Sequence, residues 1–200
     1  MTKRKCAIFL FDGYADWEPA LAIAGLRQYG GFEVNSFGIN REPIISNGGL
    51  KILPDLNADE VNVDDYELLI IPGGAAWEEG KNREIIPLVT EFQQKKRKVA
   101  AICGATILLA EMGLLNASKH TSNNDSEYIR QFCPSYQGAS LYQKEPATTD
   151  NGIITANGAA MVEFAHEIFK SMEIMPPEVL DNVKLLYKSG GMDNRLMQYS

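Results

Sequence analysis

Cysteine is scarce in this sequence, and the cysteines that occur do not form a motif. Cys6, Cys103 and Cys133 lie far apart, and no CxxC pair is present. An odd number of isolated cysteines argues against a disulfide framework and against a cysteine zinc site. We therefore expect a protein of the reducing cytoplasm that carries neither a metal nor another cofactor.

Long apolar runs and an excess of basic residues are absent as well. No stretch reaches the roughly 20 apolar residues that a transmembrane helix needs, and the apolar run at 6–11 is too short for a signal peptide. The chain has 19 basic against 26 acidic residues, which gives a net charge of -7. Nucleic acids and anionic membranes are therefore not expected partners. The one basic cluster, 95–98, is interpreted as the exposed last turn of a helix.

The 200 residues alternate short apolar runs with longer stretches of helical periodicity. Strands are expected at 7–11, 34–37, 68–71, 99–102, 119–122 and 152–156, and helices at 17–29, 85–94, 105–112 and 159–172. The runs 68–71 and 99–102 are apolar at every position, which is typical of parallel strands covered on both faces. The pattern predicts an α/β three-layer sandwich with a mainly parallel central sheet.

Two segments depart from this alternation. Residues 44–54, with Asn47-Gly48-Gly49 at their middle, predict a hairpin-like excursion. After Pro176-Pro177, an amphipathic stretch at 178–187 and a tail from 193 follow. We therefore expect one α/β domain at 1–175 and a C-terminal helical extension with a tail at 176–200.

Cys103 has the surroundings of a catalytic nucleophile. It follows a wholly apolar run, opens a helix, and has Ala101 and Ala105 two positions away on either side, with Gly104 next to it. This is the pattern of a nucleophile elbow, in which bulky side chains would clash. Because a helix N-terminus lowers the pKa of a thiol, we expect a reactive thiolate. The alternative is a buried structural cysteine.

Neighbouring turns supply further candidates, because the crevice of such a sheet lies beyond the carboxyl ends of its strands. Gly73 and Gly74 follow the 68–71 strand, and paired glycines let backbone N–H groups face a ligand. Together with the Gly104 N–H they could form an oxyanion hole. Glu18, in the first turn of the first helix, either tunes the thiol or is a surface charge. Gly73, Asn123 and Asp16 are possible site-lining residues.

These turns resemble those of the ThiJ/PfpI superfamily, also called class I glutamine amidotransferase-like, which includes intracellular proteases, glyoxalase-type enzymes and deglycases. The resemblance covers about residues 3–170 and rests on the stretches 12–18, 47–49, 71–74, 100–105, 152–156 and 163–165. It implies a flavodoxin-like fold, usually a homodimer, with Cys103 as the nucleophile and Glu18 as the carboxyl group that hydrogen-bonds its sulfur. It also implies that Gly74 and Gly104 are the oxyanion donors.

The sequence departs from the superfamily at the catalytic base. Protease-like members carry a His directly after the nucleophile, where this chain has Gly104, and glyoxalase-type members carry one after the next strand, where it has Asn123. The two histidines, His120 and His166, are too far from the crevice along their own elements and are interpreted as structural or surface residues. A true glutamine amidotransferase is therefore not expected.

Different classes of function remain open. The first is a cysteine-dependent hydrolase or lyase in which Cys103 attacks a small electrophile or a peptide-like bond, although the missing base typically contributes about 10² to 10⁴ in rate. The second is a non-catalytic redox-sensing or stress-response protein, in which Cys103 oxidises reversibly and a protonated Glu18 binds the added oxygen. A scaffold or binding protein is the third, and we favour the first.

Overall fold

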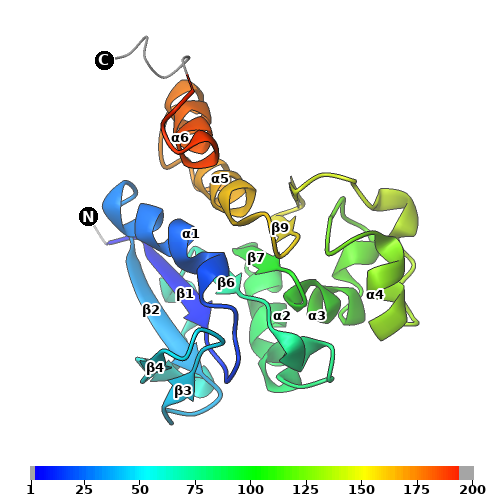
Figure 1. Ribbon diagram of the computed structural model, residues 1–200. Coiled ribbons are helices and arrows are strands. Elements are labelled where there is room, and N and C mark those ends of the chain that lie inside the picture. The colour runs from blue at the N-terminus through cyan, green and yellow to red at the C-terminus, as the bar shows by residue number, and fades with distance from the viewer. Residues whose placement is uncertain (1–2, 194–200) are drawn as a thin grey trace.

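The structure, a computed structural model, describes residues 3–193 and has a seven-stranded central sheet (Figure 1). The strand order is β5-β2-β1-β6-β7-β9-β8, and all neighbours are parallel except β8 and β9. The strands are β1 (Lys5–Phe9), β2 (Glu33–Gly38), β5 (Leu56–Asn57), β6 (Leu68–Ile71), β7 (Lys98–Ile102), β8 (Ala147–Asp150) and β9 (Ile153–Ala156). The mainly parallel α/β sandwich predicted from the sequence is therefore confirmed.

Helices cover both faces of this sheet. In Figure 1, α1 (Trp17–Gln28) and α5 (Met161–Ser171) lie together on one face, whereas α2 (Ile86–Gln94) and α3 (Ala105–Glu111) lie on the other, with α4 (Ser126–Phe132) beside α3. Every residue of β6 is fully buried, as its unbroken apolar run predicted. Of the basic cluster, Lys95 and Lys96 are exposed at the end of α2, where Lys95 pairs with Glu91 and Asp64, as predicted. Lys98, by contrast, is the first residue of β7 and is partly buried.

The predicted excursion after β2 is present as a small antiparallel hairpin. It consists of β3 (Ile44–Ile45) and β4 (Lys51–Ile52), with Ile44 opposite Ile52. The predicted strand at 119–122 is wrong, because this segment forms only one isolated bridge, between His120 and Tyr142. Two of its backbone donors go to side chains outside any strand pairing, since Lys119 N–H donates to the Asp150 carboxylate and Thr121 N–H to the Thr155 hydroxyl.

The C-terminal extension forms α6 (Pro177–Ser189), which packs against α5. Leu180 is buried in this contact, and the ion pair Lys188–Glu163 and the polar contact of His166 with Asp181 join the two helices. Of the predicted tail, only residue 193 lies among the described residues. In residues 3–193, no helix has the length and apolarity needed to cross a membrane.

Strand order determines where a ligand can approach. The chain runs from β1 outward to β2 and then returns to place β6 on the other side of β1. In such sheets a crevice opens beyond the carboxyl ends of the strands at the point where the order reverses. The turns after β1, β6, β7 and β9 all meet at this edge.

Candidate active site

Cys103 lies in a tight turn between β7 and α3, with φ of 59°. Left-handed backbone at a non-glycine residue costs of order 1–3 kcal/mol and persists only where the surroundings hold it in place. Here the Cys103 N–H donates to the Ala156 carbonyl at 2.9 Å, and the Thr106 hydroxyl donates to the Cys103 carbonyl at 2.7 Å. This strained turn is the geometry of a nucleophile elbow, as the small residues around Cys103 predicted.

Two glycines leave the space that the thiol occupies. A Cβ on Gly73 would lie 2.5 Å from the Cys103 Cβ, and a Cβ on Gly158 would lie 2.8 Å from the Cys103 Sγ. Larger residues at either position would displace the nucleophile. Gly73 was predicted to line the site, whereas Gly158 was missed; the signal for it was an Asn-Gly turn directly after β9, the strand that neighbours β7.

Glu18 is buried at the start of α1, with 1% of its surface exposed. Its Oε2 accepts the Gly73 N–H at 2.6 Å, so the turn after β6 holds the carboxyl group beside Cys103. Burial raises the pKa of Glu18 to about 7, against the opposing effects of the Gly73 N–H and of the hydrogen bond with the thiol. Near neutral pH the group is therefore able both to accept and to release a proton.

The pKa of the Cys103 thiol is raised, whereas the sequence predicted a lowered pKa. Burial and the neighbouring Glu18 carboxylate raise the pKa of Cys103 to about 11, although the Asn123 amide and the Gly104 N–H act in the opposite direction. Desolvation therefore outweighs the helix N-terminus. With a pKa of about 7 at Glu18 and about 11 at Cys103, the pair carries at most one negative charge around neutral pH, and a proton can pass between sulfur and carboxyl within it.

Asn123 contacts the thiol directly, as predicted for a site-lining residue. Its Nδ2 donates to the Cys103 Sγ at 3.2 Å, and its Oδ1 accepts the Gly158 N–H at 2.9 Å. The amide is thus held with its N–H group toward the sulfur. Tyr128 lies next in this chain of contacts, since it interacts with Asn123 and donates its hydroxyl to Glu78 Oε1 at 2.7 Å. The sequence reasoning missed Tyr128, because the short helix α4 shows no clear apolar period.

The two proposed oxyanion donors lie on adjacent turns. A Cβ on Gly104 would lie 3.1 Å from the Gly74 carbonyl oxygen, which places the two glycines in contact. Among residues 3–193, neither Gly74 nor Gly104 donates its N–H to a backbone carbonyl. Asp16, by contrast, accepts the Ser46 hydroxyl at 2.6 Å and so anchors the hairpin, with no hydrogen bond to Cys103 or Glu18 in the described chain.

Both histidines lie outside the site, as their sequence positions indicated. His120 is fully buried, with Nδ1 at 2.7 Å from the Ser118 carbonyl and Nε2 at 2.6 Å from the Tyr136 hydroxyl. His166 lies between α5 and α6 beside Asp181. Within the part of the chain that the structure describes, no group of three His, Cys, Asp or Glu side chains is arranged to hold a metal ion.

Comparison with known proteins agrees with this geometry. The sequence pattern of the DJ-1/PfpI family matches residues 4–171, which include the elbow, Glu18, Asn123 and Gly158. The chain belongs to the DJ-1/PfpI family. In this DJ-1/PfpI chain, α6 begins after the last matched residue, so the extension lies outside the family pattern.

The DJ-1/PfpI relatives include proteins named as proteases and deglycases. The chain is 38% identical over 187 residues to the uncharacterized protease YoaZ of Bacillus subtilis, with 90% of this chain and 89% of the relative covered. It is 31% identical over 93 residues to the deglycase PfpI of Pyrococcus furiosus, which covers 46% of this chain and 56% of that protein. The thiJ/pfpI family protein from Bacillus anthracis superposes with a TM-score of 0.86 at 37% identity, over 95% of this chain and 92% of the other.

Proposed function

We propose that this DJ-1/PfpI protein is a cysteine-dependent hydrolase or lyase that acts on the carbonyl group of a small-molecule or peptide-like substrate. The observation that carries the proposal is the pairing of Cys103, at a strained elbow, with a buried Glu18 whose pKa is raised to about 7. The names of the relatives, a protease and a deglycase, support the same class of chemistry.

In the proposed reaction, the Cys103 Sγ attacks the carbonyl carbon while the thiol proton passes to the Glu18 carboxylate. The carbonyl oxygen gains the negative charge, and we assign the Gly74 and Gly104 N–H groups as its donors, because in residues 3–193 neither of them donates to a backbone carbonyl. With an amide or ester, collapse of this intermediate expels an amine or alkoxide, which takes the proton back from Glu18. An α-oxoaldehyde has no leaving group, and its hemithioacetal instead moves a proton from the former aldehyde carbon to the neighbouring carbonyl carbon, which also gives a thioester on sulfur. Water then releases the acyl group from sulfur, and the enzyme returns to its starting state.

Glu18 supplies the function that a histidine serves elsewhere. The amide of Asn123 orients the sulfur by donating an N–H, but an amide takes up no proton near neutral pH. A general base is most effective when its pKa lies near the working pH. The raised pKa of Glu18 meets that condition, so a site without a catalytic His can still move the thiol proton.

Turnover assays with a matched cysteine control test this function. Cys103→Ser should abolish turnover of peptidyl amides, esters and α-oxoaldehydes, whereas Cys133→Ser, which removes a buried thiol, should leave it unchanged. A panel in which purified protein turns over none of these carbonyl classes, or in which Cys103→Ser retains full activity, would refute the proposal.

A redox-sensing role is the second candidate, and the contact between the Glu18 carboxyl and the sulfur favours it specifically. A peroxide would transfer one oxygen to the Cys103 thiolate and leave as water or an alcohol, and a protonated Glu18 would donate a hydrogen bond to the new S–O group. Peptide mass spectrometry should then show oxygen added at Cys103 before Cys6 or Cys133. Glu18→Leu should reduce the yield of the stable oxidised form without any substrate turnover being involved.

For the assembly, we propose a cytoplasmic homodimer. The three cysteines are all free, which is typical of a reducing compartment. Several apolar side chains on or beside the hairpin are exposed, namely Ile45, Leu50 and Leu53. Exposed apolar groups of this kind are characteristic of surfaces that associate. Sedimentation analysis of the full chain measures the assembly directly, and a monomer at micromolar concentration would contradict it.

A further inference from the structure

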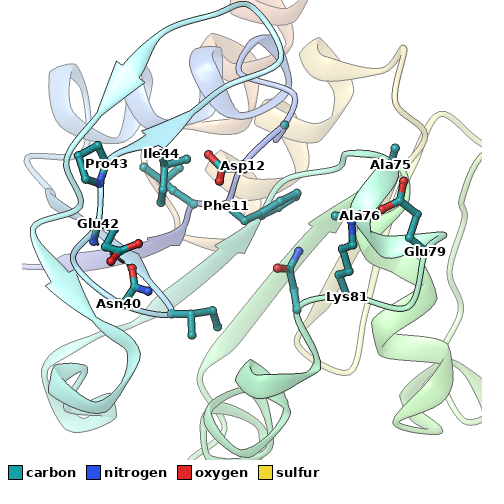
Figure 2. A pocket seen from close by; sticks show the side chains of 14 residues that line it. Phe11, Asp12, Asn40, Glu42, Pro43, Ile44, Ala75, Ala76, Glu79 and Lys81 are labelled. Atoms are coloured by element: carbon teal, nitrogen blue, oxygen red, sulfur yellow. Dashed lines mark hydrogen bonds and ion pairs between the residues drawn. The ribbon is translucent and has the colours of Figure 1, made fainter.

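One cavity of the described chain lies apart from Cys103. It has a volume of about 460 Å³ and is lined by the segments that follow β1 and β2 and by the turn region after β6 (Figure 2). This position is the point where the strand order reverses, and pockets that hold small organic ligands commonly have volumes of about 300–1,000 Å³. Neither Cys103 nor Glu18 lines it.

The charges of this cavity do not balance. Lys81 forms an ion pair with Glu79 on one wall, and Figure 2 shows this pair on the opposite side of the cavity from Glu42. Glu42 forms no ion pair with any described residue, and Asp12 uses only one carboxylate oxygen, Oδ1, to accept the Ile45 N–H at 2.8 Å. Two carboxylates therefore lack a positive partner beside an apolar floor formed by Phe11 and Ile44.

A buried donor on the same cavity also lacks a partner. The Nδ2 atom of Asn82 is buried, and no acceptor for it exists in residues 3–193. Asn82 has left-handed backbone, with φ of 62°, at the start of the turn that leads into α2. A buried polar group without a partner is unusual in a folded protein and calls for an explanation. A ligand with a hydrogen-bond acceptor would supply the missing partner.

We propose that this cavity binds a small organic cation, namely an alkylguanidinium or alkylammonium group on a short apolar chain that also carries a carbonyl oxygen. The cation pairs with the Asp12 and Glu42 carboxylates, its hydrocarbon chain lies on Phe11 and Ile44, and the carbonyl accepts from Asn82 Nδ2. A blocked arginine has this chemistry, and its guanidinium can bond carboxylates in a bidentate manner.

The proposed cation site adjoins the candidate active site without sharing its residues. A Cβ on Gly74 would lie 2.8 Å from the Gly13 carbonyl and 2.9 Å from the Phe11 ring, so Phe11 and Gly13, which line the cavity, form a wall against the turn that carries the oxyanion donor. The site thus goes beyond the proposed reaction. Its occupancy can be measured in Cys103→Ser protein, in which the reaction is absent.

Two isosteric probes separate recognition of charge from recognition of shape. Nα-acetyl-arginine amide carries a guanidinium, whereas Nα-acetyl-citrulline amide carries a neutral urea of the same size. Calorimetric titration of the full chain should show binding of the arginine probe at least tenfold tighter than binding of the citrulline probe. The difference should shrink as ionic strength rises, because salt screens exposed charges.

Charge-neutralising variants locate the site. Glu42→Gln and Asp12→Asn should each weaken the arginine probe by about tenfold, and Asp12→Asn retains an oxygen that can accept the Ile45 N–H. Glu84→Gln is the matched control, because Glu84 is an exposed acid near Asn82 that does not line the cavity. Equal weakening by all three variants would show only a general charge effect and would overturn the proposal.

Asn82→Gly tests the buried donor with opposite effects on stability and binding. Glycine accepts the left-handed backbone of residue 82, so the empty protein should melt at the same or a higher temperature. Binding of the arginine probe should nevertheless weaken severalfold. Equal affinity for both probes, or unchanged affinity in Asn82→Gly and Glu42→Gln together, would refute the cation site. The same titration in Cys103→Ser protein keeps that outcome separate from any failure of the proposed catalysis.

Discussion

Replacing Glu18 by Gln should make Cys103 more acidic and should slow the proposed reaction at the same time. The substitution removes the carboxylate charge but keeps the size of the side chain. Its amide oxygen can still accept the Gly73 N–H, which Glu18 Oε2 accepts at 2.6 Å. An amide N–H group then faces the sulfur in place of a carboxylate oxygen. The Cys103 thiol therefore ionises without a negative charge beside it.

The size of the effect follows from the contact. The Glu18 carboxylate is the second largest cause, after burial, of the pKa of about 11 at Cys103. Two unit charges about 4 Å apart interact by about 4 kcal/mol at an effective dielectric constant of 20, and one pH unit corresponds to about 1.4 kcal/mol. The pKa of Cys103 in Glu18→Gln should therefore fall by about 1 to 3 pH units.

Alkylation by iodoacetamide, followed by peptide mass spectrometry, measures this pKa residue by residue. Cys6 and Cys133 serve as internal controls, because 0% and 2% of their surfaces are exposed. Glu67→Gln is the matched variant, since Glu67 lies before β6 at the opposite edge of the sheet and pairs with Arg4. It should leave the alkylation profile of Cys103 unchanged.

Turnover should change in the opposite direction. Glutamine cannot take the proton from the thiol, so the rate on a carbonyl substrate should fall by about 10² to 10⁴ although more thiolate is present. A rise in the pKa of Cys103 in Glu18→Gln would refute this reasoning. It would mean that Glu18 is protonated throughout the titration and is a better hydrogen-bond donor to the thiolate than an amide.

Three further predictions concern the same site. Asn123→Ala should raise the pKa of Cys103, because the amide N–H of Asn123 lowers it, and alkylation of Cys103 as a function of pH is the check. Gly158→Ala should slow alkylation of Cys103 more than tenfold, since its Cβ would lie 2.8 Å from the sulfur. Burial raises the pKa of Glu18 from 4.5 to about 7, so the folded state binds the Glu18 proton more tightly than the unfolded state does. The contribution of Glu18 to the free energy of unfolding should therefore fall by about 3 kcal/mol as pH rises from 4 to 8. Denaturant unfolding of Glu18→Gln measured over the same pH range should lack this pH dependence.

The elements that the sequence predicted best are those with one dominant signal. The runs at β6 and β7 are apolar at every position because both of their faces are covered, and both became central strands. The small residues around Cys103 predicted the elbow for a similar reason, since only small side chains fit a turn with φ of 59°. In both cases a local steric requirement restricts which residue types can occupy the positions.

The contacts that the sequence could not predict depend on the spatial order of the strands. Gly158 lies 55 residues beyond Cys103 and reaches the sulfur only because β9 pairs with β7. The segment at 119–122 has a strand-like composition, yet the side chains of Asp150 and Thr155 accept the N–H groups of Lys119 and Thr121. The pKa of Cys103 was predicted in the wrong direction, because burial of the elbow beside Glu18 outweighs the helix N-terminus.

The position of Glu18 in the fold explains how the proposed nucleophile, Cys103, could react without a catalytic His. The residue starts α1, which follows β1, and the N–H that holds it belongs to the turn after β6, while the thiol follows β7. These three strands are adjacent, so the sheet itself places carboxyl, backbone donor and sulfur at one edge. Burial there raises the pKa of the carboxyl toward neutrality and disfavours a second negative charge. The same desolvation that makes the thiol a weak acid therefore makes its neighbour a suitable base, and a histidine is not required for the proton to move.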